Sequence, residues 1–322
     1  MNFFQEYFLK NDLLAAPLAG ITNIPFRRIV RKFFDGPIYS EMISTEGVAR
    51  MVKKTIKLSD VTETDHPIFL QLFGNNPGSF EKSIKLLEEQ SSPTGFDINA
   101  GCPVKKVLRS QAGAYHLKDL DNFVKIIKSV RKATQRPLTI KTRLGFEKNH
   151  YVYKEIVSIA YDEGVDAVIL HGRTKADLFS GEVNLDKIAD AVAVSKLPII
   201  GNGDIKDMKS YSKMKSTGVA GVMIGRGMMN SPWIFSALKE GKDPDCYLSP
   251  ADIYNLLLEF SILEKEHRRA RCYIEIMKKY AVWFSRGLKG VSEFRRQIYA
   301  TSSETEFFDL LKRFYLDRSE VK

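Results

Sequence analysis

Cysteine is scarce in this sequence of 322 residues, which contains Cys102, Cys246 and Cys272 and no other. Three cysteines are too few for a disulfide framework, and their separation excludes the close pairs that zinc sites use. The sequence also lacks any run near the ~18 apolar residues that a membrane span needs, and its first ten residues contain no long apolar stretch. These absences predict a reduced, cytoplasmic protein without structural metal and without a membrane segment.

Acidic residues are in short supply relative to basic ones. Lys and Arg number 49 against 39 Asp and Glu, which gives a net charge of +10 at pH 7. Such an excess attracts polyanions, whether nucleic acid or an anionic membrane surface. Residues 265–296 hold most of it, because ten basic residues there outnumber three acidic ones for a net charge of +7.

Aromatic residues are interleaved with this basic segment, namely Tyr273, Tyr280, Trp283 and Phe284. Two interpretations are open. The segment is either a solvated helical face, the usual fate of a charge run, or a surface that follows a phosphate backbone while aromatic side chains pack or stack. The candidate phosphate contacts are Lys265, Arg268, Arg269, Arg271, Lys278, Lys279 and Arg286.

Short apolar or β-branched runs alternate with longer segments of helical periodicity, which is the pattern of repeated βα units. The predicted strands are 13–17, 37–41, 67–72, 95–99, 137–142, 167–171, 198–202 and 221–225, and the helices between them include 80–89, 120–134, 153–163, 185–194 and 208–216. Eight such repeats predict an α/β fold, a (β/α)₈ TIM barrel, whose usual length of about 250 residues would end near residue 240.

The pattern changes after the eighth repeat. From Ser249 onward the strand signals stop, and helices are predicted over 251–265, 267–286, 292–298 and 303–317. Ser249 and Pro250 resemble a helix start. A polar stretch at residues 241–245 is a plausible boundary. We therefore expect a catalytic barrel over residues 1–243 and a small all-helical domain over residues 244–322.

Active sites of such barrels lie at the carboxyl ends of the strands, so the residues that end each run are the candidates. Asn202, Gly203 and Asp204 follow the seventh run, and Gly225 and Arg226 follow the eighth. Glycine lets backbone amides approach phosphate oxygens there. A single glycine of this kind is more often a turn, but the pair on adjacent strands, with an arginine, favours a phosphate site.

Two further strand ends carry reactive side chains. Lys141 lies in an apolar-flanked strand, where it must either point outward or meet an anionic partner. Beside a phosphate cradle and His171 it would suit the anionic part of a reduced flavin. Cys102 follows the fourth strand between Gly101 and Pro103. It is either a small buried apolar residue or a proton donor, since a thiol with a pKa of about 8.5 is protonated at pH 7.

These strand-end motifs resemble those of the tRNA-dihydrouridine synthases, and most closely the bacterial B-type enzymes. The matching segments are residues 16–27, 71–74, 97–103, 141–143, 171–174, 202–204 and 223–226. The Asn-x-Gly-Cys-Pro sequence at 99–103 is highly specific to that family. The resemblance covers residues 12 to about 240 strongly and the helical tail loosely.

The resemblance implies an FMN-binding barrel with a helical tRNA-binding domain, which reduces uridine in tRNA to 5,6-dihydrouridine at the expense of NADPH. In this chemistry the reduced flavin delivers hydride to carbon 6 of uracil, and Cys102 protonates carbon 5. We expect a monomer without a separate dinucleotide-binding domain. By motif, Pro17, Leu18, Ala19, Gln71, Lys141 and His171 contact the flavin ring, and Asn202, Gly203, Asp204, Gly225 and Arg226 hold the ribityl chain and phosphate. Asn99, Arg173 and Arg143 contact the uracil.

Two positions depart from the family pattern. Tyr115 and His116 place a bulky pair in the loop after Cys102, where the family commonly has small residues, so flanking substrate contacts stay open there. Leu18 replaces the usual Met, which conserves volume. The alternatives are an FMN barrel that acts on a free pyrimidine or an enone, and a non-catalytic RNA-binding barrel, since fold does not fix function.

Overall fold

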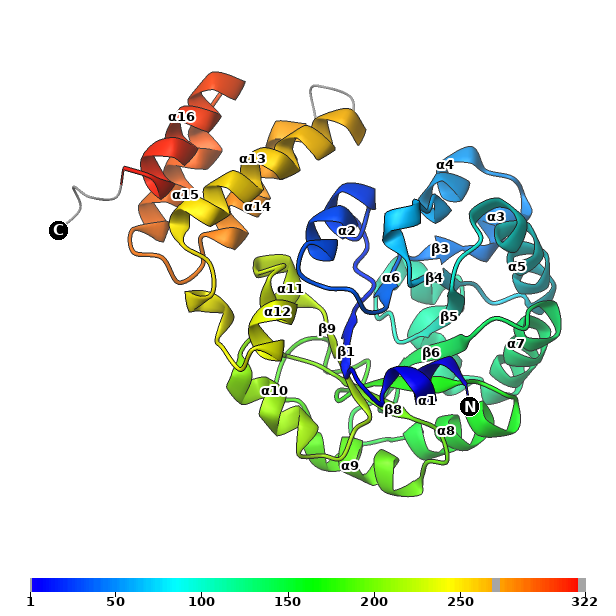
Figure 1. The fold of residues 1–322 in the computed structure, drawn as a ribbon. Helices are drawn as coiled ribbons and strands as arrows, with labels where there is room; N and C mark the ends of the chain where they lie inside the picture. The colour runs from blue at the N-terminus through cyan, green and yellow to red at the C-terminus, as the bar shows by residue number, and fades with distance from the viewer. Residues whose placement is uncertain (1, 268–272, 318–322) are drawn as a thin grey trace. The chain divides into compact units, whose positions relative to one another are not determined.

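The computed structural model describes residues 2–267 and 273–317, and within them the chain forms two compact units (Figure 1). The first, called here the barrel unit, comprises the N-terminal residues through Asn23 together with Asp35–Ile205 and Lys209–Gly225. The second, called the helical unit, comprises Ile24–Phe34, Lys206–Met208 and the residues from Arg226 onward.

The barrel unit is a closed ring of parallel strands, as predicted (Figure 1). Its strands are β1 (Leu13–Ala15), β2 (Ile38–Tyr39), β3 (Ile43–Ser44), β4 (Ile68–Phe73), β5 (Gly95–Ala100), β6 (Leu138–Arg143), β7 (Ala167–His171), β8 (Ile199–Asn202) and β9 (Gly221–Ile224). From β4 to β9 each strand pairs in parallel with the next. Pairing of β1 with β9, and of β2 with both β1 and β4, closes the ring.

The second position of the ring differs from the predicted strand at 37–41. It is filled by β2 and β3, which both lie beside β4. The interruption falls at Ser40, whose hydroxyl oxygen accepts the backbone N–H of Gln71 at 3.1 Å and donates to the carbonyl of Glu41 at 2.8 Å. The Ser40 hydroxyl thus replaces one of the backbone hydrogen bonds that a continuous strand would form with β4.

Helices surround the ring between successive strands (Figure 1). They are α3 (Thr45–Ala49), α4 (Lys53–Ile56), α5 (Pro77–Ser91), α6 (Lys105–Arg109), α7 (Leu120–Ala133), α8 (Tyr153–Asp162), α9 (Leu185–Val194) and α10 (Met208–Lys215). Helix α5 shows how the sequence sets its start, because Asn76 accepts the N–H of Ser79 at 3.0 Å and Pro77 occupies the first turn. It is therefore longer than the predicted 80–89.

The amino-terminal ends of the strands are filled by a short helix that the sequence did not predict, α1 (Phe3–Tyr7). Its Phe4 is fully buried with Leu14 and Ile169, and the Phe4 ring lies 5.3 Å from that of Phe69. Burying a phenylalanine side chain contributes roughly 1.5–3 kcal/mol. This end of the barrel is a packed core.

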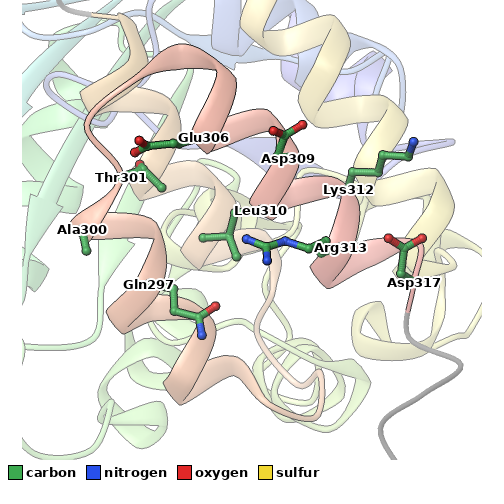
Figure 2. A pocket seen from close by; sticks show the side chains of 9 residues that line it. All are labelled: Gln297, Ala300, Thr301, Glu306, Asp309, Leu310, Lys312, Arg313 and Asp317. Atoms are coloured by element: carbon green, nitrogen blue, oxygen red, sulfur yellow. The ribbon is translucent and has the colours of Figure 1, made fainter.

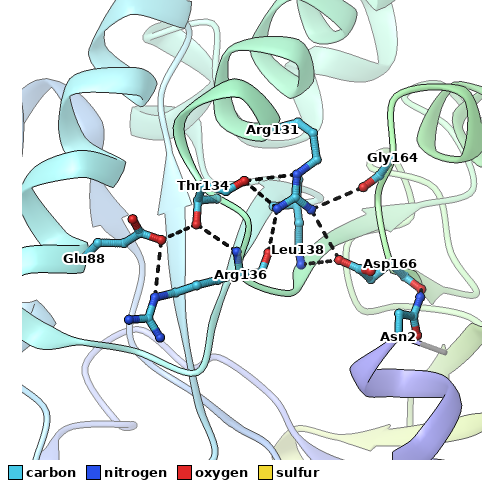
Figure 3. A network of polar contacts seen from close by, with 8 residues as sticks. All are labelled: Asn2, Glu88, Arg131, Thr134, Arg136, Leu138, Gly164 and Asp166. Atoms are coloured by element: carbon cyan, nitrogen blue, oxygen red, sulfur yellow. Dashed lines mark hydrogen bonds and ion pairs between the residues drawn. The ribbon is translucent and has the colours of Figure 1, made fainter.

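A polar network ties elements together at the same end (Figure 3). Asp166 lies just before β7. Its carboxylate accepts the backbone N–H of Leu138 at 2.8 Å and forms an ion pair with Arg131 at 3.4 Å. Its carbonyl accepts the amide of Asn2 at 3.2 Å. Arg131 also donates to the carbonyl of Arg136 at 2.8 Å. Asp166 thus holds β6, β7, α7 and the residue before α1 in register.

The helical unit consists of α2 (Ile24–Arg31), α11 (Arg226–Asn230), α12 (Ile234–Lys239), α13 (Pro250–His267), α14 (Tyr273–Phe284), α15 (Val291–Ala300) and α16 (Glu304–Tyr315). Aromatic rings form its core. The ring centres of Phe260 and Tyr280 are 4.5 Å apart, and those of Phe26 and Tyr280 are 5.7 Å apart. The helical C-terminal region is therefore confirmed. Helix α2, which lies early in the chain, contributes to this core.

The network at Asp166 yields a stability prediction. Asp166→Asn keeps the shape of the side chain but removes its charge, so the ion pair with Arg131 is lost while other partners stay close. We expect a loss of about 1–2 kcal/mol, seen as a fall of a few degrees in the melting temperature. The network lies at the end of the barrel opposite the strand-end candidates, so catalytic activity should not change; a variant that melts like the wild type would contradict the role of this network.

Candidate active site

Most of the strand-end residues singled out in the sequence gather at the carboxyl ends of β4 to β8. The ladder places Asn99 of β5 beside Lys141 of β6, and His171 of β7 beside Asn202 of β8. Side chains bond across the strands, with Asn99 Nδ2 donating to Gln71 Oε1 at 2.8 Å. This is the end at which barrels of this class carry their chemistry.

Cys102 lies on a turn that leaves β5 at this end. The carbonyl oxygen of the Asn99 side chain accepts the backbone N–H of Cys102 at 2.9 Å and of Gly101 at 3.2 Å. Behind the turn, Gly113 has φ +64°, and a Cβ there would lie 2.8 Å from the Cys102 carbonyl oxygen. Only glycine fits there. The turn that carries the thiol is thus fixed from two sides.

The environment of Cys102 keeps its thiol protonated. Burial raises its pKa above the usual range, and this outweighs the lowering by a backbone hydrogen bond at Val104 and by the nearby charges of Arg143 and Lys141. A protonated thiol can donate a proton but is a poor nucleophile. Cys246 is also a free thiol and is exposed, while Cys272 lies outside the described residues.

Lys141 reaches toward the carboxyl end of β8. Its Nζ donates to Asn202 Oδ1 at 2.8 Å, and Asn202 Nδ2 donates to the carbonyl of Met223 at 2.8 Å. Burial and, to a lesser extent, the charge of Arg143 lower the pKa of Lys141 to about 8, against the raising effect of Asp97. At neutral pH the ammonium is still mostly charged. Its environment in the barrel therefore suits an anionic partner.

Two arginines that the sequence assigned to substrate also brace a loop. Arg143 donates to the carbonyls of Thr174 and Leu178, each at 2.8 Å, and to that of Gly101 at 2.9 Å. Arg173 donates to the carbonyl of Ser180 at 3.0 Å and pairs with Asp204. Both guanidinium groups are thus held largely by protein atoms, and Arg143 also fixes the turn before Cys102.

The braced loop, residues 174–181, holds apolar side chains in solvent. Leu178 is 50% exposed with φ +53°, and Phe179 is 55% exposed. The Arg143 guanidinium lies 5.4 Å from the centre of the Phe179 ring, and His171 lies 6.4 Å from it. A loop that is held by hydrogen bonds and exposes an aromatic ring beside the strand ends can receive a planar group. Sequence reasoning missed these two residues.

The glycines after β8 and β9 differ in what surrounds them. Gly203 has φ +133°, and a Cβ there would lie 2.8 Å from Val183 Cγ2 and 3.0 Å from His171 Cδ2. At Gly225 a Cβ would meet only Ala16 at 3.7 Å and Leu18 at 3.9 Å. Pro17 and Leu18 are half-buried, and Ala19 is exposed. Arg226 is exposed and begins α11 in the helical unit.

The bulky pair after Cys102 is split by the fold. His116 is fully buried and stacks on Phe123 of α7 with 5.1 Å between ring centres, and burial lowers its pKa to about 4. Tyr115 is half-buried. His116 therefore packs against the barrel helices, and any effect on flanking substrate contacts falls on Tyr115.

The predicted phosphate contacts need one correction. Lys278 is 5% exposed, and its Nζ donates to Glu275 at 2.7 Å and to the carbonyl of Thr301 at 2.8 Å, so it cannot present its charge at the surface. Lys279 and Arg286 are exposed, and Lys265 is exposed but pairs with Glu304 at 3.0 Å. Arg268, Arg269 and Arg271 lie outside the described residues. Tyr273, Tyr280 and Phe284 are core residues and so do not stack on a ligand.

A groove of about 760 Å³ lies beside α15 and α16 in the helical unit (Figure 2). It is lined by Gln297, Ala300, Thr301, Glu306, Asp309, Leu310, Lys312, Arg313 and Asp317. Its lining carries three acidic and two basic side chains, so its charge favours neither a cation nor a phosphate.

Sequence reasoning also missed Asp97, a carboxyl inside β5 that is fully buried. Its Oδ1 accepts the hydroxyl of Thr139 at 2.6 Å, and its Oδ2 accepts the Gln71 amide at 2.7 Å. Burial raises its pKa to about 7 against the lowering by these bonds and by Lys141. The available signal was an acidic residue between Phe96 and Ile98 in a buried strand.

Other classes of site are not evident in the described part of the chain. No group of three or more His, Cys, Asp or Glu residues within 2–267 and 273–317 is arranged to hold a metal ion. Among those same residues, no helix combines the length and the apolar character needed to cross a bilayer.

These features define the protein first by class, as a (β/α)₈ barrel with polar side chains and a thiol at the carboxyl ends of its strands. Among solved structures it resembles histamine dehydrogenase from Rhizobium sp. 4-9, with a TM-score of 0.55 and 11% identity. That match covers 79% of this chain and 49% of the dehydrogenase, and at this identity it shows the fold alone.

The sequence then places the chain within one family. Residues 13–319 match the dihydrouridine synthase (Dus) family. A probable tRNA-dihydrouridine synthase from Aquifex aeolicus is 33% identical over 90% of this chain and 92% of its own length. The tRNA-dihydrouridine synthase B of Escherichia coli K12 is 32% identical over 96% of this chain and 98% of its own. The protein belongs to the dihydrouridine synthase family, which confirms the resemblance found in its motifs.

The burial of Asp97 predicts a pH dependence of stability. Its pKa of about 7 lies above the value of about 3.9 in an unfolded chain. The folded protein therefore binds more protons than the unfolded chain between these values, and the Asp97 contribution to stability falls as pH rises through that window. From pH 5 to pH 8, the melting temperature of Asp97→Asn should thus rise by a few degrees relative to that of the wild type. A difference that is constant with pH would contradict the raised pKa.

Proposed function

We propose that the protein is a flavin-dependent enzyme that reduces uridines in tRNA to 5,6-dihydrouridine, with NADPH as the reductant. The observation that carries the proposal is the position of Cys102, on a turn held by Asn99 at the carboxyl ends of the strands in a dihydrouridine synthase barrel, where burial raises the pKa of its thiol. We further propose that it acts as a monomer in the cytoplasm, with a catalytic domain over residues 1–243 and a tRNA-binding domain over 244–322.

The strand-end residues fit FMN by their chemistry. At Gly225 a Cβ would meet only ordinary contacts, so an anionic group can approach the backbone there, while Gly203 must be glycine because a Cβ would clash with Val183 and His171. We propose that both, with Asn202, Asp204 and Arg226, hold the ribityl chain and phosphate. Lys141 supplies a cation for the polar edge of the ring. The remaining proposed ring contacts are Pro17, Leu18, Ala19, Gln71 and His171.

Bound FMN would supply a hydride to carbon 6 of the uracil ring. Cys102 would then give the proton of its Sγ–H bond to carbon 5, and the thiolate left behind would recover a proton from water. Its raised pKa supports this role, because the donor must be protonated at the working pH.

Asn99 is suited to bind the uracil by exchanging a weak contact. One Nδ2 proton is bonded to Gln71 at 2.8 Å, and the other faces the sulfur of Met42 at 3.0 Å. A thioether is a weak acceptor. We propose that this N–H turns to a uracil carbonyl, that Arg143 and Arg173 support the site through the braced loop, and that Phe179 stacks on a base of the tRNA.

Cys102→Ala tests the proton-donor role. Loss of the thiol should lower the rate of dihydrouridine formation at least 100-fold, while the flavin absorbance of the purified protein stays as in the wild type. Cys246→Ala is the matched control, because that thiol is exposed, and its activity should be unchanged. Wild-type protein that shows no flavin absorbance after reconstitution with FMN would contradict the proposed function, and reduction of free uracil without tRNA would favour a different substrate.

The exposed cations of α14 and the segment that follows it supply a test of the tRNA surface. Lys279→Glu with Arg286→Glu should weaken tRNA binding about 10-fold or more at low salt and reduce the slope of log affinity against log salt by roughly 1 per lost phosphate contact. The control is Lys53→Glu with Lys54→Glu, a pair that is equally exposed on α4 of the barrel unit. Equal binding by both double variants and wild type would show that the charged segment is only a solvated face.

A further inference from the structure

Asp97 has no part in the proposed chemistry, yet it is fully buried on β5, two residues before Asn99. We propose that Asp97 is a positioning residue, whose carboxylate fixes the orientation of the Gln71 and Asn99 side-chain amides and, through them, the turn that carries Cys102. Its effect on catalysis rests on the proposed function. Its effect on the turn does not.

The directions of the hydrogen bonds fix how each side-chain amide is oriented. A carboxylate can only accept, so the group that Gln71 turns toward Asp97 must be its Nε2, which lies at 2.7 Å. This leaves Oε1 facing the other way, where it accepts Asn99 Nδ2 at 2.8 Å. The Asn99 oxygen must then face the turn, where it accepts the N–H groups of Gly101 and Cys102. Each bond dictates the next.

The other side of the carboxylate repeats this polarity. Thr139 donates its hydroxyl proton to Asp97 Oδ1 at 2.6 Å, so its oxygen is left to accept from the hydroxyl of Tyr39 at 3.2 Å. Every donor in the network, here called the Asp97 relay, points toward one buried charge. No other single side chain in the relay is an obligatory acceptor.

Water cannot replace these bonds. Asp97, Thr139 and Tyr39 are fully buried, Gln71 is 1% exposed and Asn99 is 6% exposed. A wrongly oriented amide in such surroundings leaves a donor facing a donor, which costs about 1–3 kcal/mol for each unsatisfied group. The charged and titratable groups that interact electrostatically with Asp97 are Lys141 on β6 and Tyr39 on β2. The relay is therefore held in one orientation while Asp97 is ionised, and with a pKa of about 7 the ionised form predominates at pH 8.

Asp97→Asn keeps the size of the side chain and removes the obligatory acceptor. The Asn amide can take either orientation, and one of them places an N–H against Gln71, which forces Gln71 and then Asn99 to turn over. The N–H groups of Gly101 and Cys102 then lose their acceptor. At pH 8, where Asp97 is ionised in the wild type, we expect hydrogen–deuterium exchange of residues 99–104 in the variant, measured by mass spectrometry, to be at least 10-fold faster than in wild type, with helix α8 unchanged.

The kinetic readout separates positioning from substrate binding. In the same variant, kcat for tRNA reduction should fall at least 10-fold while KM for tRNA changes less than 3-fold. Asp166→Asn is the matched control, since it neutralises a carboxylate at the opposite end of the barrel. It should leave both the exchange of residues 99–104 and kcat unchanged. Wild-type exchange at residues 99–104 in Asp97→Asn would overturn the proposal.

A rescue variant tests direction rather than packing. In Asp97→Asn combined with Gln71→Glu, the carboxylate is one step nearer to Asn99, and a single orientation of Asn99 is again enforced. Exchange of residues 99–104 should return to within 3-fold of wild type, and the double variant should fold even if Asp97→Asn alone does not. A double variant that shows no recovery overturns the proposal. Exchange needs no tRNA, so a wild-type protein that fails to reduce tRNA would remove the proposed function and leave this test standing.

Discussion

The structure of the site depends on one constraint, which is that polar groups inside the closed ring of strands must find partners there. Closure through β1 and β9 turns the inner faces of the strands toward one another and excludes water. Asp97, Gln71 and Asn99 satisfy one another, and Lys141 bonds with Asn202. An unpaired group among them would cost more than the whole bond contributes when it is made. The constraint is what holds the reactive end in a defined geometry.

The same constraint divides the site into fixed and available groups. Arg143 and Arg173 donate hydrogen bonds to backbone carbonyls of the 174–181 loop and its neighbours. These bonds hold both guanidinium groups in place and fix the loop. Groups that can still meet a ligand include the thiol of Cys102, the ammonium of Lys141 and the ring of Phe179, which is 55% exposed although Arg143 and His171 lie beside it. This division agrees with an enzyme that donates a proton to a planar substrate.

Much of the fold could be predicted from the sequence, because parallel strands buried on both faces appear as short apolar runs and their helices as periodic ones. The helical ends differed by a few residues, as at α5, where the capping residue Asn76 lies outside the apolar period. The break between β2 and β3 was not predictable, because it depends on the hydroxyl of Ser40 accepting the backbone N–H of Gln71 on the neighbouring strand β4. Likewise, no local pattern shows that Phe26 belongs with Tyr280.

The candidate site was predictable where chemistry and position coincide in a motif, as at Cys102, Lys141 and Asn202. It was not predictable where a role depends on a distant partner. Lys278 resembles a surface cation until Thr301 supplies a carbonyl from beyond α15. Asp97 is one acidic residue between apolar neighbours, and its role follows only from the hydrogen bonds that Thr139 and Gln71 donate to it.

The most direct test of the account is the dihydrouridine content of tRNA from cells that lack this protein, mapped position by position. The account predicts that dihydrouridine disappears at particular tRNA positions and returns when the wild-type protein is restored, but not when Cys102→Ala is supplied. An unchanged dihydrouridine map in its absence, or full restoration by Cys102→Ala, would contradict it.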